Sequence, residues 1–159
     1  MFLHLPMVLG LLMAGDGAPE EAAPPELCVQ LGLSEIFEGT RLGTIAIEYR
    51  HSPLWRELRP MVGVAFTNDE DKLLYLGMQY DFHLTERWRL SPNTAAGYFN
   101  DGGGLHLGGH IEFRSGIELT YRFHERWRLG LHLSHSSNAG LFDSNPGTET
   151  LSLSLASRF

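Results

Sequence analysis

The sequence predicts an all-β fold, an eight-stranded antiparallel up-and-down transmembrane β-barrel. Three observations support this prediction. After residue 27, apolar and polar side chains alternate along almost the whole chain, which is the period of a β-strand. The alternating runs number eight, and turns or loops rich in Gly, Asn, Pro or charge separate them in the order of a meander. The 159 residues fit one domain.

The first four strands are predicted from alternation and from the turns between them. Apolar residues alternate over 29–34, 44–51, 60–67 and 74–84. The segment SPLWREL, 52–58, connects the second run to the third, and the charged segment NDEDK, 68–72, forms a turn before the fourth run. The fourth run is the most regular of this half.

The second half of the chain continues the same pattern. The fifth strand, 88–100, is the least regular because it contains Pro92, and the Gly-rich loop DGGGLHLGG, 101–109, follows it. A long sixth strand, 111–123, could cross a bilayer. The stretch from Leu129 to Phe159 has two alternating runs joined by a polar loop, and therefore predicts a hairpin of strands seven and eight.

Alternation alone is compatible with two kinds of barrel. A soluble, lipocalin-like barrel encloses its apolar face, whereas a membrane barrel turns that face outward. The polar face of the sixth strand carries both charge signs, which could pair in a narrow lumen. The pentapeptide ERWRL occurs twice, at 86–90 and 125–129, where Trp beside Arg suits a membrane interface. The final Phe159 is similar to the terminal signal of bacterial outer-membrane barrels. These features favour the membrane barrel.

Composition excludes several classes of function. The formal net charge of −7 argues against nucleic-acid binding, and the single cysteine, Cys28, excludes an intrachain disulfide and a cysteine-based zinc site. The apolar start predicts a signal peptide and flexible start over residues 1–23, with the barrel over 24–159.

Three polar residues continue the apolar face of the final hairpin at its loop end. The parity of Leu129, Leu131 and Leu133 also places His135 and Ser137 on that face, and Glu149 shares the parity of Leu151 and Leu153. Directly opposed strand residues lie close enough to interact, so His135 could lie between Ser137 and Glu149. This is the order of nucleophile, base and acid in a serine-hydrolase triad.

The string HSSNAG, 135–140, followed by Glu149, resembles the PagL-type lipid A 3-O-deacylase family of outer-membrane barrels. In that family a His-x-Ser-Asn motif precedes a glutamate fourteen residues after the histidine, as here. The resemblance implies that Ser137 is the nucleophile, His135 the general base and Glu149 the residue that orients the histidine. It also implies an oxyanion hole from Asn138, Ala139 and Gly140. The substrate would be lipid A (lipopolysaccharide) in the outer membrane of a Gram-negative bacterium.

No cofactor or metal is expected. His106 and His110 in the Gly-rich loop lack a third ligand, and no GxSxG elbow or phosphate-binding loop is present. Two alternatives stay open, an outer-membrane phospholipase that uses the same triad and a non-catalytic structural barrel. The sequence also leaves open whether the chain forms a homodimer.

Overall fold

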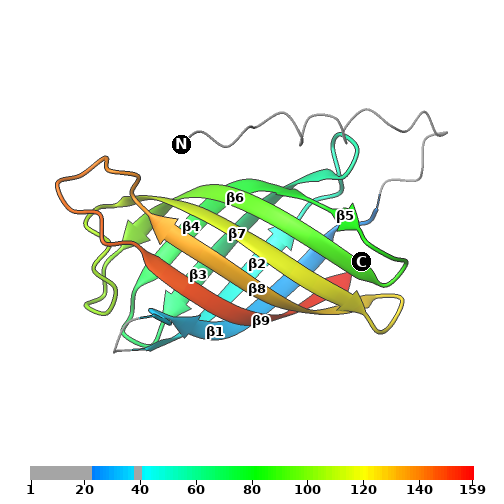
Figure 1. Cartoon of the computed structure of the whole chain (residues 1–159), viewed down its shortest axis with the longest axis horizontal. Helices are drawn as coiled ribbons and strands as arrows, with labels where there is room; N and C mark the ends of the chain where they lie inside the picture. The colour runs from blue at the N-terminus through cyan, green and yellow to red at the C-terminus, as the bar shows by residue number, and fades with distance from the viewer. Residues whose placement is uncertain (1–22, 38–40) are drawn as a thin grey trace, which may run out of the picture.

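The computed structural model describes residues 23–37 and 41–159, which form a closed antiparallel β-barrel (Figure 1). Pairing of β1 with β9 and of β4 with β6 closes the sheet. The predicted eight-stranded meander is therefore confirmed. The strands are β1 Glu26–Ser34, β2 Leu42–Arg50, β3 Leu58–Thr67, β4 Lys72–Tyr80, β6 Trp88–Asn100, β7 Ile111–Arg122, β8 Trp127–Ser137 and β9 Thr148–Arg158, with a two-residue extension, β5 Phe82–His83.

The predicted signal peptide, residues 1–23, lies outside the described residues except for Ala23. That prediction is therefore not addressed by the fold. Within 23–37 and 41–159, the structure has no helix long and apolar enough to cross a membrane.

Two irregularities lie where β4, β5 and β6 meet. The fourth strand was predicted to run to Leu84, but it ends at Tyr80, because its pairing with β6 stops at Gln79. Asp81 still faces the lumen, and its amide donates to the carbonyl of Glu57 (3.1 Å). The extension β5 then pairs with Leu90 and Arg89 of β6. Pro92 lies in the gap between the two pairings, since β4 pairs with β6 only as far as Asn93. The missing amide of Pro92 therefore costs no hydrogen bond in the sheet.

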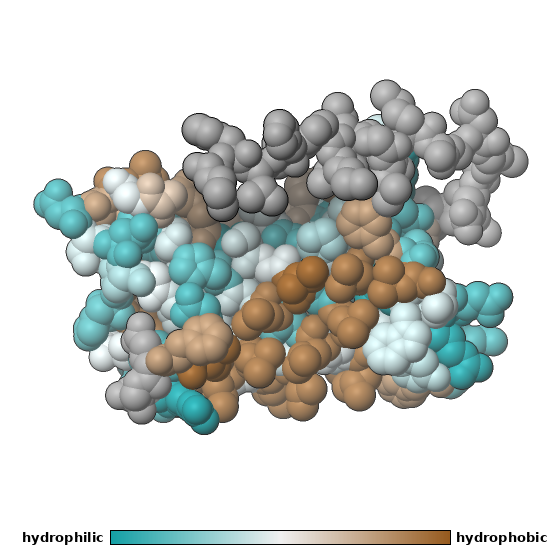
Figure 2. All heavy atoms as spheres, viewed as in Figure 1, coloured by the Kyte–Doolittle hydropathy of each residue, from teal (hydrophilic) through white to brown (hydrophobic). Residues whose placement is uncertain are grey.

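The barrel is apolar outside and polar inside. Leucines, isoleucines and aromatic residues on the outward face of the strands are exposed, and they form a hydrophobic band between two hydrophilic ends (Figure 2). The alternate residues are buried and mostly polar or charged. This inversion confirms the prediction of a membrane barrel over a soluble one. Trp88 and Trp127, from the two ERWRL segments, lie at the same end of the barrel, where the short turns are.

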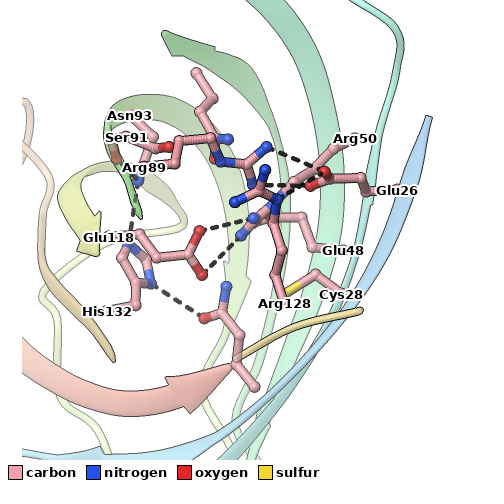
Figure 3. Close-up of polar contacts among 12 residues, drawn as sticks. Glu26, Cys28, Glu48, Arg50, Arg89, Ser91, Asn93, Glu118, Arg128 and His132 are labelled. Atoms are coloured by element: carbon pink, nitrogen blue, oxygen red, sulfur yellow. Dashed lines mark hydrogen bonds and ion pairs between the residues drawn. The ribbon is translucent and has the colours of Figure 1, made fainter. Parts of the chain in front are cut away.

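Buried ion pairs fill the barrel interior (Figure 3). Arg50 of β2 bonds to Glu48 (2.6 Å) on its own strand and reaches across the lumen to Glu118 of β7 (2.7 Å). Arg89 of β6 similarly bonds to Glu26 of β1 (2.9 Å). A charge in this water-poor space is tolerated only with a partner of the opposite sign. These pairs therefore hold opposite walls of the barrel in fixed relation.

We expect replacement of Arg50 by alanine to destabilise the barrel strongly. It leaves Glu48 and Glu118 as buried carboxylates without their arginine, which costs about 3–5 kcal/mol. The free energy of unfolding, measured by urea titration in lipid vesicles, reports the loss. The matched control is Arg126→Ala, which removes an exposed arginine and should change that free energy by less than about 0.5 kcal/mol. Equal stability of the two variants would contradict the role of the interior pairs.

Candidate active site

The hairpin of β8 and β9 brings His135 and Glu149 together on the outer face of the barrel. The two residues are direct partners in the antiparallel register. Their side chains are partly exposed, at 47% for His135 and 33% for Glu149. The predicted face and the predicted opposition of these two residues are therefore confirmed. The lumen-facing neighbours Ser134 and Ser136 are buried, as the alternation requires.

A hydrogen bond joins the imidazole to the carboxylate. His135 Nδ1 lies 3.0 Å from Glu149 Oε1. Because a carboxylate only accepts hydrogen bonds, Nδ1 carries the proton, and Nε2 is left with its lone pair as a base. The ring also packs over Gly147, where a Cβ atom would lie 2.9 Å from His135 Cε1. Glu149 and Gly147 together set the position of the imidazole.

Ser137 is the last residue of β8 and lies two positions beyond His135 on the same outward face. Its side chain is partly exposed, and within the described residues it makes no hydrogen bond. The structure therefore places Ser137 two residues from His135 on the same face of β8, without an Oγ–Nε2 hydrogen bond. Such bonds are often long in ligand-free enzymes and shorten when substrate binds.

Asn138 organises the loop 138–147 that follows the serine. It is fully buried, and its Nδ2 donates to the carbonyls of Leu107 (2.9 Å) and Ser144 (2.6 Å). Its Oδ1 accepts from the amide of Gly140 (3.0 Å). The side chain of Asn138 and the amide of Gly140, two predicted oxyanion donors, are thus engaged within the loop. The amide of Ala139, the third candidate, has no acceptor among the described residues.

Apolar side chains surround the polar trio. Phe113 of β7 is the register partner of Ser137. Leu133 and Leu151 form the next outward-facing pair after His135 and Glu149, in the direction of the short turns. All three are exposed on the outer face, in the surface that meets lipid tails. A substrate that enters from the membrane would reach the hydroxyl without crossing the barrel wall.

Two residues near the site were missed by sequence reasoning. Gly147 has a φ of +70°, and Asn145 accepts a hydrogen bond from the Asn138 amide (2.9 Å). Both lie in a loop rich in Gly, Asn and Pro, a composition that predicts a loop but not its contacts.

The histidines of the Gly-rich loop have other partners. His106 Nδ1 lies 3.3 Å from Asp101 Oδ2, and His110 Nδ1 lies 3.1 Å from the carbonyl of Phe99. In the part of the chain that the structure describes, no group of three or more His, Cys, Asp or Glu side chains could hold a metal ion.

Comparison with known proteins decides the family. The family model "Lipid A 3-O-deacylase (PagL)" matches residues 44–158, which include most of the barrel and the whole candidate site. The chain belongs to this family. It is therefore an outer-membrane ester hydrolase whose function is lipid A 3-O-deacylation. None of the curated proteins matches the chain in sequence.

Solved structures similar to this deacylase support the fold. The outer membrane enzyme PagL has 19% sequence identity and a TM-score of 0.65, over 84% of this chain and 99% of that one. A de novo designed transmembrane β-barrel has 12% identity and a TM-score of 0.66, over 88% and 98%. Neisserial surface protein A has 14% identity and a TM-score of 0.61, over 88% and 100%. At these identities the likeness concerns the fold alone.

We expect Gly147→Ala to lower deacylase activity while the barrel still folds. The new Cβ would press on His135 Cε1, and a φ of +70° is strained for alanine. The displacement should reduce kcat about 10-fold or more, measured on purified lipid A in mixed micelles. Gly43→Ala is the control, because Gly43 is an exposed residue of β2 and the nearest atom to an added Cβ there, Asn68 Oδ1, would lie 3.8 Å away. Equal activity of the two variants would show that the contact with His135 is unimportant.

Proposed function

We propose that this deacylase hydrolyses the 3-position acyl ester of lipid A with a catalytic triad of Ser137, His135 and Glu149. The observation that supports the triad best is the 3.0 Å bond between His135 Nδ1 and Glu149 Oε1, on the lipid-facing surface beside Ser137. A polar pair in that surface is unfavourable unless it is bonded or has a function.

In the first half of the reaction, Ser137 becomes acylated. His135 Nε2 accepts the proton of the Ser137 hydroxyl while Oγ attacks the ester carbonyl. Glu149 stabilises the imidazolium that forms. When the tetrahedral intermediate collapses, the bond to the sugar oxygen breaks and His135 donates its proton to that oxygen.

In the second half, water regenerates the serine. His135 Nε2 takes a proton from water, whose oxygen attacks the acyl-enzyme carbonyl. The acyl–Oγ bond then breaks, the proton returns to Ser137 and a 3-hydroxy fatty acid leaves. The residues that carry this scheme all belong to one chain, so it does not require a homodimer.

The amide of Ala139 is our candidate oxyanion donor. It follows the nucleophile by two residues, and the positive φ of Ala139 (+54°) is held by the loop. Asn138 and Gly140, which the sequence also suggested, contribute by shaping this loop through their own hydrogen bonds. A preformed amide donor can stabilise the charge that develops on the carbonyl oxygen.

The position of the site suggests which leaflet supplies the substrate. Ser137 lies at the barrel end that carries the longer loops 101–110 and 138–147 (Figure 1). In outer-membrane barrels the longer loops are extracellular and the short turns periplasmic. We therefore assign the site to the outer leaflet of a Gram-negative outer membrane, where lipopolysaccharide lies. From its apolar composition we also propose that the segment 1–23 contains a cleaved signal peptide.

The experiment that tests this function is mass spectrometry of lipid A from cells that express the protein. Wild type should remove one 3-hydroxyacyl chain, and Ser137→Ala or His135→Ala should lower the activity by about 10³-fold or more, because each removes a triad member. Heat-modifiable migration on a gel checks that each variant folds. Ser136→Ala is the matched serine control, since its hydroxyl faces the lumen, and it should retain activity.

Other outcomes would identify the alternatives. Intact lipid A together with fatty acid released from phospholipid would favour a phospholipase. Intact lipid A and intact phospholipid would favour a structural barrel. Full activity in Ser137→Ala would leave the deacylase but remove the proposed nucleophile.

We expect Glu149→Gln to reduce kcat by about 10²- to 10⁴-fold with little change in KM. A neutral amide can keep the imidazole in place but cannot stabilise its positive charge. Steady-state kinetics on lipid A in mixed micelles gives both constants. Asp143→Asn removes an exposed carboxylate of the neighbouring loop 138–147 and should behave as wild type. If the two variants had the same kcat, Glu149 would have no role in the reaction.

A further inference from the structure

The Gly-rich loop 101–110 has no role in the proposed triad, yet it is built into the mouth of the barrel. Leu105 and Leu107 are buried, and they pack in one cluster with Leu42, Phe99 and Leu73. Both leucines line the cavity at the mouth of the lumen, so the loop folds inward there. It lies at the end of the barrel that carries the site (Figure 1). Two sets of contacts hold it, one on the turn between β3 and β4 and the other on loop 138–147.

Asp71 makes the first set of contacts. Its carboxylate is buried, and it accepts hydrogen bonds from the amides of Gly102 (2.7 Å), Gly104 (3.3 Å) and Leu105 (2.8 Å). Thr67 Oγ1 donates a fourth (2.7 Å). Hydrogen bonds to an ionised acceptor are the strong ones, so this one side chain fixes the start of the loop.

The glycines permit that close approach. A Cβ atom at Gly102 would lie 2.3 Å from the carbonyl carbon of Glu70, and one at Gly104 would lie 2.6 Å from Asp71 Oδ2. Any larger residue would push the loop away from the carboxylate. The run DGGG therefore serves a structural purpose, which is to bring three amides onto Asp71.

The far end of the loop makes the second set of contacts. The carbonyl of Leu107 accepts from Asn138 Nδ2 (2.9 Å). A Cβ atom at Gly108 would lie 2.1 Å from the Ser144 carbonyl oxygen, and one at Gly109 would lie 2.0 Å from the Phe142 ring. The loop thus lies directly against loop 138–147, next to the serine.

We propose that Asp71 is a positioning residue for this active site. It holds loop 101–110, which through Leu107, Gly108 and Gly109 holds Asn138 and the loop that follows Ser137. The inference rests on the proposed function, because it assigns Asp71 to the same reaction. Asp71 touches neither Ser137 nor His135, so its effect is transmitted through backbone placement, and misplacement of reacting groups by about 1 Å can cost about 100-fold in rate.

The test compares Asp71→Ala, Asp71→Asn and Asp69→Asn in the full-length protein. Asp69 is an exposed residue of the same turn, and its carboxylate accepts from Asn68 Nδ2 (3.2 Å) rather than from the amides of loop 101–110. Asp69→Asn therefore removes the same charge and keeps the Cβ that lies beside Gly104. We expect kcat on purified lipid A to fall about 10- to 100-fold in Asp71→Ala at nearly constant KM. The kcat of Asp71→Asn should fall less, since the side-chain oxygen of asparagine can still accept hydrogen bonds from two amides. The kcat of Asp69→Asn should equal that of wild type.

Hydrogen exchange provides a readout independent of activity. The amides of residues 102, 104 and 105 should exchange about 10-fold faster or more in Asp71→Ala, and so should those of 140 and 141. Only variants that show the heat-modifiable gel migration of a folded barrel are compared. If Asp71→Ala does not fold, Asp71→Asn replaces it in both measurements.

The outcomes separate the two proposals. If wild type does not deacylate lipid A, the proposed function is wrong. If wild type is active and Asp71→Asn has the same kcat as Asp69→Asn, only the proposed role of Asp71 is wrong. Faster exchange at 102–105 without a change at 140–141 or in kcat would also overturn it. A lower kcat at constant KM, together with faster amide exchange at residues 140 and 141 in the same variants, supports it.

Discussion

Charge pairing inside the barrel is the constraint on which the rest of the structure depends. Among residues 23–37 and 41–159, and apart from Asp71 at the mouth, the buried charged residues are five arginines and five acidic residues. Nine of these ten side chains lie in ion pairs, which stabilise charges where little water can solvate them, and Glu112 is the exception. The pairs Arg50–Glu118 and Arg89–Glu26 join strands on different sides of the barrel. A cavity near the mouth is about 40 Å³, room for a few waters but not for an acyl chain. This agrees with the outer-wall site that we propose for the chemistry on a lipid.

On that outer wall, polar residues are the exception, and sheet register determines where they lie. A slip of β9 by one residue against β8 would turn Glu149 into the lumen while His135 stayed on the outer face, so the alternation of both strands specifies the pair. The buried serines and threonines on the inner face of the same strands reinforce that register. Fold and site are thus two consequences of one alternating pattern.

The sequence predicted what depends on local periodicity. Strand number, the outward face of His135, Ser137 and Glu149, and the inward face of Ser136 follow from parity alone. The partner of each lumen charge does not, because Arg50 meets Glu118 only through the tilt and stagger of the closed sheet. The break at Asp81 was missed because apolar and polar residues keep alternating past it to Leu84, whereas the pairing with β6 is interrupted there. Likewise, the positive φ of Gly147 and the bonds of Asn138 depend on how two loops pack.

The site combines two kinds of support. His135 and Glu149 are held by ladder hydrogen bonds on both sides of β8, in a sheet that cannot shift without breaking many of them. Ser137 is the last residue of its strand, and Ala139 lies beyond it, so the sheet no longer fixes their backbone. Loops at the surface are mobile unless other groups hold them. Asn138, buried and bonded to the carbonyls of two loops, supplies that restraint where the sheet ends. In the triad that we propose, the nucleophile is therefore positioned by loop–loop contacts, whereas the base is positioned by the barrel itself.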